Sequence, residues 1–209
     1  MKGIIGLSYN LGLLLCRAVY LQVLFVIYCL RGGVVLGLFP SLYGMFKVIN
    51  QLINGDISTY QDMKVAYKEA YREEFKASNS VGYILLGLVA FLSFDLAISK
   101  RFIQQPIIHG ALLLLMIMTI GTILYSFPVL IRYNLTIKQV ITQSFLMFIS
   151  NIVEAVAIVI SFLLMPIIFA FSPILIILVG LPALVFIVLF FSKQGIIKTE
   201  ARFDNYENG

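Results

Sequence analysis

Charged residues are scarce in this sequence, and its longest uncharged run indicates its structural class. Only 12% of the 209 residues are charged. No charge occurs between Glu154 and Lys193, which leaves 38 consecutive uncharged and mostly apolar residues. As one helix this run would be about 57 Å long, whereas the hydrocarbon core of a bilayer is only about 30 Å thick. The run therefore predicts two membrane spans that fold back on each other in an all-α, polytopic membrane protein.

Residues suited to catalysis or metal binding are equally scarce. A single histidine, His109, excludes a histidine-based metal site. The two cysteines, Cys16 and Cys29, lie thirteen residues apart on one expected helix, which is too far for a disulfide. No serine occupies a Gly-x-Ser-x-Gly turn, and no glycine-rich phosphate loop ends in Lys-Ser or Lys-Thr. We therefore expect no enzymatic activity, no cofactor and no metal.

The overall composition predicts one membrane domain over residues 1–209. Hydrophobic residues make up 61% of the chain, well above the roughly 45–50% of soluble domains. The net charge of +5 is expected to set membrane topology rather than to bind nucleic acid, because no soluble basic domain is present. The N-terminal segment has no small-residue cleavage site and is expected to be a retained span rather than a signal peptide.

Five apolar segments have the length of about 17–25 residues that crossing a bilayer requires. They lie at about 8–30, 80–98, 107–131, 152–170 and 173–191. A sixth crossing at residues 34–53 stays open, as does a break in the first helix at Gly32-Gly33. With five spans, ten basic residues outside them share one side of the membrane and three share the other. The positive-inside rule then puts the N-terminus outside and the C-terminus in the cytoplasm.

Two amphipathic helices are expected between spans, at the membrane interface. The first covers about residues 58–79, and Ser58 with Gln61 has the spacing of a capping box. The second covers about residues 136–150 and begins with the same spacing at Thr136. Each helix follows a Phe-Pro pair and precedes a span, which suggests, weakly, an internal duplication.

The first interfacial helix carries two adjacent stripes of side chains. Its apolar stripe contains Tyr60, Met63, Tyr67, Tyr71 and Phe75. Its basic stripe contains Lys64, Lys68, Arg72 and Lys76. Aromatic residues at the interface and lysines near anionic headgroups are typical of a helix on the cytoplasmic membrane surface. Two interpretations stay open: a surface strut, and a docking helix for a cytoplasmic or membrane partner.

Four ionisable residues fall inside or at the ends of the expected spans. Such residues are costly in a bilayer and are usually paired. Their depths predict two ion pairs, Arg17 with Asp95 near the outer surface and Arg31 with Glu154 near the inner surface. The alternative is that the arginines extend to lipid headgroups on their own.

Two segments of the sequence carry a resemblance to a known family. The first runs from Arg31 to Lys47 and includes Gly37, Phe39 and Pro40. The second runs from Phe127 to Lys138 and includes Pro128, Arg132, Asn134 and Thr136. Together they resemble the YesL-like integral membrane proteins, a bacterial family of unknown molecular function. The resemblance implies a bacterial plasma-membrane protein whose gene lies near carbohydrate ABC importers and glycoside hydrolases. It brings no catalytic or binding residue with it.

These observations together favour a non-enzymatic accessory subunit of a carbohydrate (oligosaccharide) ABC importer, which assists assembly or coupling. Its expected partners are the lipid bilayer, the importer's permease subunits and, at the cytoplasmic face, the importer's ATPase. A stand-alone transporter or channel is one alternative, although two of the five spans contain no charge to line a path. A membrane regulator or scaffold of envelope-polymer synthesis is the other.

Overall fold

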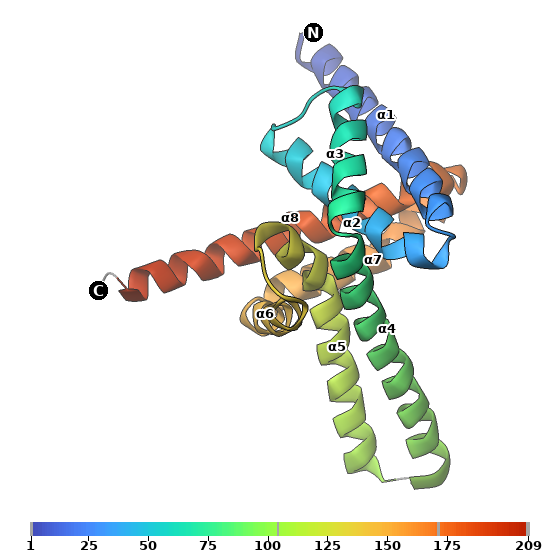
Figure 1. The fold of residues 1–209 in the computed structure, drawn as a ribbon, viewed down its shortest axis with the longest axis vertical. Coiled ribbons are helices and arrows are strands. Elements are labelled where there is room, and N and C mark those ends of the chain that lie inside the picture. Colours follow the sequence, from blue (N-terminus) through green and yellow to red (C-terminus); the bar gives the residue numbers. More distant parts are fainter. Residues whose placement is uncertain (1, 104, 171, 208–209) are drawn as a thin grey trace. The chain divides into compact units, whose positions relative to one another are not determined.

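The computed structural model describes residues 2–103, 105–170 and 172–207, and within these ranges it contains helices and no strand (Figure 1). The α-helices are α1 (Lys2–Arg31), α2 (Val35–Asn54), α3 (Tyr60–Glu73), α4 (Phe75–Ile98), α5 (Pro106–Arg132), α6 (Ile137–Ser150), α7 (Ile152–Ala170) and α8 (Ile174–Glu207). A short π-helical turn, Ser99–Ile103, extends α4. The predicted all-α class is therefore confirmed.

Five of the helices contain segments that are long and apolar enough to cross a membrane. These segments are Gly12–Arg31, Phe75–Arg101, Pro106–Arg132, Ile152–Ala170 and Ile174–Arg202. Each one contains most or all of a predicted span, and large apolar side chains such as Val153 and Leu163 are exposed on them. Exposed side chains of this kind fit a lipid environment. The chain is thus a multi-pass membrane protein whose apolar helices contact the bilayer.

Two predicted segments end at other residues than the helices that contain them. The last predicted span stops at residue 191, whereas α8 continues to Glu207, because no proline or glycine pair follows residue 191 within the helix and its polar end has partners of its own. The first interfacial helix was expected to reach residue 79, but α3 ends at Glu73 and the next apolar helix already begins at Phe75. Hydropathy shows where the apolar residues end, which is not where the hydrogen-bonded helix ends.

Residues 31–54 do not form a sixth candidate span among the described helices. The first helix ends at Arg31, and a turn reverses the chain through Gly33 and Val34, whose φ angles are 70° and 64°. A positive φ is rare for a β-branched residue. It is held here by the Val34 N–H, which donates to the Cys29 carbonyl over 2.9 Å. The chain therefore breaks at the glycine pair, and α2 packs on α1 as the second arm of a hairpin.

The helices group into two compact units. Unit 1 contains α1, α2 and α3 together with residues 158–189, and unit 2 contains residues 77–157 with the end of α8 from residue 190. In unit 1 the Phe-Pro helix α2 packs on the capped helix α3, and in unit 2 the Phe-Pro helix α5 packs on the capped helix α6. The recurring order seen in the sequence thus corresponds to a recurring pair of packed helices.

Candidate functional site

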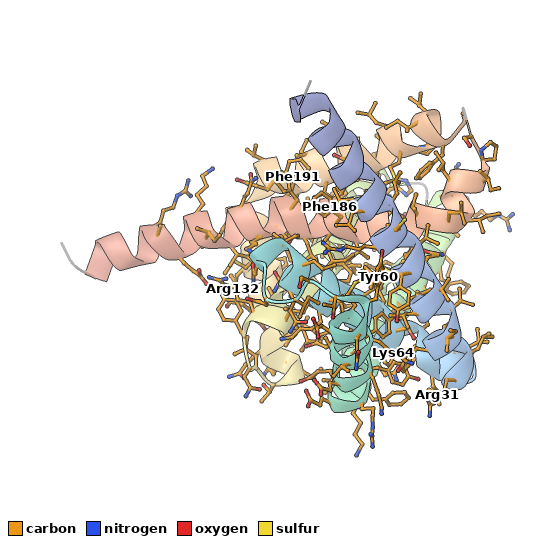
Figure 2. All side chains as sticks on the ribbon, turned by 90° about the horizontal axis from the view of Figure 1, so that it is seen from above. Arg31, Tyr60, Lys64, Arg132, Phe186 and Phe191 are labelled. Atoms are coloured by element: carbon orange, nitrogen blue, oxygen red, sulfur yellow. The ribbon has the colours of Figure 1, made fainter. Side chains whose placement is uncertain are left out.

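In unit 1, α3 runs beside α1 over most of its length (Figure 1). At the start of α3, Arg17 Nη2 donates to the Ser58 carbonyl over 2.8 Å, and the Tyr20 and Tyr60 ring centroids are 5.2 Å apart. Tyr60 and Lys64 are labelled on α3 in Figure 2. At its end, the Tyr28 and Tyr71 centroids are 5.0 Å apart. In these contacts the residue numbers rise together along both helices. α3 therefore lies alongside α1 and parallel to it, rather than across its end.

The apolar stripe of α3 is part of the core of unit 1. Met63 and Tyr67 are completely buried and Tyr71 is 7% exposed. The Tyr67 hydroxyl donates to the Ser41 carbonyl on α2, and its ring lies so close to Gly44 that a Cβ there would be 3.0 Å from it. Met63, Tyr67 and Tyr71 are three of the nine residues predicted as a partner surface. Because they are buried against neighbouring helices of unit 1, a partner cannot reach them.

The basic stripe beside the apolar stripe is exposed. Lys64, Lys68, Arg72 and Lys76 all face outward, interspersed with the exposed acids Asp62, Glu69 and Glu73. Tyr60 is 42% exposed at the start of this face and Phe75 is half-buried at its end. Lys76 lies in the first turn of α4, directly after α3. We call these four basic residues, with Glu69 and Glu73, the charged face of α3.

The capping box of α3 is shifted by one residue from the predicted position. Thr59, not Ser58, is the N-cap: its Oγ1 accepts the Asp62 N–H over 3.1 Å, and Asp62 Oδ2 accepts the Thr59 N–H over 3.3 Å. Hydrogen bonding to the Thr59 side chain first, and then to the Thr59 backbone N–H, lowers the pKa of the Asp62 carboxyl. The Ser58 carbonyl instead accepts a hydrogen bond from the Arg17 guanidinium. The start of α3 is therefore fixed both by its own capping box and by α1.

Alkaline pH is expected to destabilise unit 1 through Tyr67. Burial raises the pKa of its phenol well above the usual value of about 10. The neutral phenol therefore contributes its full stability below about pH 10, and this contribution is lost as the pH rises toward the folded-state value. Thermal unfolding in detergent should show a melting temperature that falls above pH 10. Tyr67→Phe should lower stability by about 1 kcal/mol at neutral pH and reduce the alkaline fall.

The control for this experiment is Tyr60→Phe, because that hydroxyl belongs to a side chain that is 42% exposed. It should leave both the neutral melting temperature and the alkaline fall unchanged. An alkaline fall that is equally steep in Tyr67→Phe would contradict the role of this phenol.

In unit 2, the polar end of α8 is attached to α5 and α7 by ion pairs. Arg132 Nε donates to Glu200 Oε1 over 2.8 Å, and Arg132 Nη2 and the Tyr133 hydroxyl donate to the same carboxylate. Lys198 Nζ lies 3.3 Å from Glu154 Oε1. The Tyr133 pKa is raised to about 12, first by burial and then by this carboxylate. Arg132, one of the family-like residues, thus connects α5 to α8.

A buried asparagine between α6 and α7 forms the centre of unit 2. Asn151 is 2% exposed, and its Nδ2 donates to the Met147 carbonyl over 3.0 Å and to Thr199 Oγ1 over 2.9 Å. The Asn151 backbone carbonyl accepts a hydrogen bond from the Tyr125 hydroxyl over 3.2 Å. The α8 backbone approaches so closely that a Cβ at Gly195 would be 2.9 Å from Asn151 Cγ. Nothing in the sequence marked this residue, because a single polar side chain gives no periodic signal.

Two of the four ionisable span residues make hydrogen bonds within their own unit. The hydrogen-bond partner of Arg17 is the Ser58 carbonyl, and that of Glu154 is Lys198. Arg31 is exposed and Asp95 half-buried. The pairs Arg17 with Asp95 and Arg31 with Glu154 would each join unit 1 to unit 2, and they stay predictions.

The family-like segments supply packing and capping. Gly37 and Pro40 are buried in α2, with Phe39 half-buried, and Phe127 and Pro128 are buried in α5. Asn134 is exposed in the loop after α5. The Thr136 N–H donates to Gln139 Oε1 over 3.0 Å in the predicted capping box of α6. Across the described residues, no three His, Cys, Asp or Glu side chains gather as metal ligands.

These features define a polytopic α-helical membrane protein without an assigned chemistry, and the comparisons with known proteins agree. Residues 18–96 match the family described as "Protein of unknown function, DUF624". The chain is 29% identical over 129 residues to the uncharacterised protein YesL of Bacillus subtilis, which is 62% of this chain and 60% of YesL. The resemblance to the YesL-like family predicted from the sequence is thereby confirmed.

Two further uncharacterised proteins of Bacillus subtilis are similar to this chain. YesV is 26% identical over 140 residues, which cover 63% of this chain and 65% of YesV. YteU is 25% identical over 120 residues, which cover 56% of this chain and 53% of YteU. The match therefore spans less than two thirds of each relative's length. No solved structure matches the chain, and neither the family nor the relatives carry an enzymatic description.

Proposed function

We propose that this protein is a non-enzymatic accessory subunit of a bacterial carbohydrate ABC importer, in the plasma membrane, which assists the assembly or coupling of the permease subunits. One observation carries the proposal: the charged face of α3 is held rigidly along a candidate membrane span by buried tyrosines. The gene neighbourhood implied by the YesL-like resemblance supports the choice of an importer as the partner.

The charged face cannot lie against lipid tails. Each lysine or arginine at the centre of the hydrocarbon costs about 2.5–3.5 kcal/mol on insertion scales, so four of them would cost on the order of 10 kcal/mol. The face must therefore meet water or a polar protein surface, although α1 beside it is apolar enough to span. A helix that is apolar toward its own unit and charged on the outside is suited to contact a membrane partner at a polar surface.

The fixed charge pattern would supply specificity more than affinity. Lys64, Lys68 and Arg72 recur every four residues, Glu69 directly follows Lys68, and Glu73 directly follows Arg72. Complementary charges across an interface orient two partners and disfavour wrong ones, whereas the net affinity of exposed pairs is small. The partner surface that fits is predominantly acidic, with basic residues placed opposite Glu69 and Glu73.

A native pull-down tests this proposal. The chain is tagged at its C-terminus, extracted in mild detergent from its native host, and the co-purifying proteins are quantified by mass spectrometry. We expect the permeases of a carbohydrate importer to be recovered with the unmodified chain. A variant with Lys64→Glu, Lys68→Glu and Arg72→Glu should lose them at least tenfold while accumulating to the same level.

The matched control reverses three exposed charges elsewhere, Lys100→Glu, Arg101→Glu and Lys138→Glu, and should retain the permeases. Recovery of the chain alone, as a discrete oligomer, would contradict the accessory role and favour a stand-alone transporter. Full retention of the permeases by the α3 variant would place the contact on another surface.

A further inference from the structure

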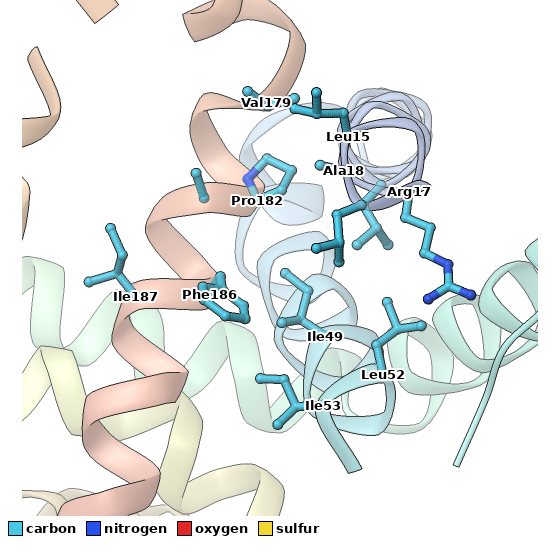
Figure 3. A pocket seen from close by; sticks show the side chains of 13 residues that line it. Leu15, Arg17, Ala18, Ile49, Leu52, Ile53, Val179, Pro182, Phe186 and Ile187 are labelled. Atoms are coloured by element: carbon cyan, nitrogen blue, oxygen red, sulfur yellow. The ribbon is translucent and has the colours of Figure 1, made fainter. Parts of the chain in front are cut away.

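Unit 1 contains an apolar cavity of about 490 Å³ between α1, α2 and the first half of α8 (Figure 3). Pockets that bind small molecules have volumes of roughly 300–1,000 Å³. The lining consists of aliphatic side chains such as Leu15, Ile49 and Leu52, together with Pro182 and Phe186 of α8. Its one charged member is Arg17. The cavity is therefore suited to a long apolar chain with a polar group at one end.

Arg17 lies at the polar end of this cavity. Figure 3 shows its side chain extending from α1 away from Pro182 and Phe186, so that the guanidinium is at the side nearest α3. There Nη2 donates to the Ser58 carbonyl over 2.8 Å, in the polar loop before α3. A carbonyl carries no net charge, and neither of the ion pairs found among the described residues includes Arg17. The remaining guanidinium N–H groups can thus serve an anion.

The surroundings determine which anion comes with an apolar chain. α1 and α8 are both candidate spans, so the medium around this cavity is the lipid bilayer. The planar guanidinium matches the oxygens of a phosphate group and binds them through paired hydrogen bonds. A zwitterionic headgroup such as phosphatidylcholine has no net charge and carries an ammonium group that the guanidinium repels. The phosphatidylglycerol headgroup has a net negative charge and carries no ammonium group.

We infer that this cavity binds an anionic phospholipid, with an acyl chain between α1, α2 and α8 and the phosphate at Arg17. The site is independent of the proposed importer contact, since the charged face of α3 contributes none of its lining. Bound lipid would fill the space beside the α1–α2 hairpin and neutralise the arginine at the level where α3 begins.

A single fluorescent reporter tests this site directly. The sequence contains no tryptophan, so Phe186→Trp makes the cavity the sole source of tryptophan emission in the full chain. The protein is reconstituted in phosphatidylcholine vesicles that contain equal fractions of dibrominated phosphatidylglycerol or dibrominated phosphatidylcholine. We expect half-maximal quenching at an at least fivefold lower fraction of the anionic lipid. Adding Arg17→Gln should abolish this preference, and adding the control Arg31→Gln should preserve it.

A second reporter separates the site from the bulk membrane. Phe94 is 66% exposed on α4, and Phe94→Trp should be quenched equally by both brominated lipids. Equal quenching at position 186, or a preference that survives Arg17→Gln, would overturn the inference. Loss of the preference on adding inorganic phosphate would assign the site to free phosphate and overturn the lipid. Native mass spectrometry of the chain without the tryptophan should show phosphatidylglycerol retained, and its loss in Arg17→Gln.

Discussion

Gly37→Ala is expected to destabilise the protein by about 3 kcal/mol or more, because it forces two backbones apart. A Cβ on Gly37 would lie 2.3 Å from the Cys29 carbonyl oxygen and 3.0 Å from its carbonyl carbon. A Cβ on Gly32 would lie 2.3 Å from Gly37 Cα. All of these are backbone atoms of the α1–α2 hairpin, which cannot move aside as the end of a side chain can. This contact sets how closely α2 packs on α1.

Thermal unfolding of the purified protein in detergent measures this effect. For a chain of about 200 residues each kcal/mol shifts the melting temperature by about 2–4 °C, so Gly37→Ala should melt roughly 6–12 °C lower. The control is Gly12→Ala on α1, the other helix of the hairpin, where a Cβ meets nothing within 4 Å. That variant should be unchanged or stabilised by up to about 1 kcal/mol, through higher helix propensity. Equal melting of the two variants would contradict the close backbone approach.

Asn151→Ala is expected to have the second largest effect, about 2–3 kcal/mol, within unit 2. Its side chain makes buried hydrogen bonds to the Met147 carbonyl and to Thr199 Oγ1. Removing it leaves both groups without this partner in a region that water does not reach, since Thr199 is 5% exposed. The end of α8 would then lose the hydrogen bond that Thr199 makes to the junction between α6 and α7.

A double-mutant cycle isolates the Asn151–Thr199 hydrogen bonds. Thr199→Val keeps the shape of the side chain and should cost about 1–2 kcal/mol alone. The double variant should be less destabilised than the sum of the single variants by about 1 kcal/mol. Ser93→Ala is the control, because that exposed hydroxyl bonds only to the Val89 carbonyl of its own helix, and it should change little. Strict additivity of Asn151→Ala and Thr199→Val would contradict the contact.

Long-range hydropathy and capping chemistry made the helical elements predictable. The α7 boundaries, residues 152–170, match the prediction, because an apolar run of this length has one way to satisfy its backbone in a bilayer. The Thr136 cap was equally clear. At the start of α3, however, Ser58 with Gln61 and Thr59 with Asp62 both have capping-box spacing, and only the tertiary contact of the Ser58 carbonyl with Arg17 distinguishes them.

The partners of a helix face were not predictable from the sequence. The Tyr60 to Phe75 stripe correctly indicated a face that avoids water, but periodicity does not say whether lipid, a partner or the same chain covers it. Tyr67 is covered by α1 and α2. Likewise Glu154 offered several basic partners at similar depth, and Lys198 became one only because α8 continues beyond its apolar part. Such choices depend on contacts between residues far apart in the sequence.

Photo-cross-linking from the charged face of α3 in living cells tests the central proposal most directly. A photoreactive amino acid at Lys68 should form an adduct with a permease subunit of a carbohydrate importer. The same group at Leu163, an apolar α7 side chain that is 70% exposed, should form none, because lipid surrounds it. An adduct with the permease from Lys68 alone would support the accessory role, whereas the absence of any permease adduct from Lys68 would contradict it.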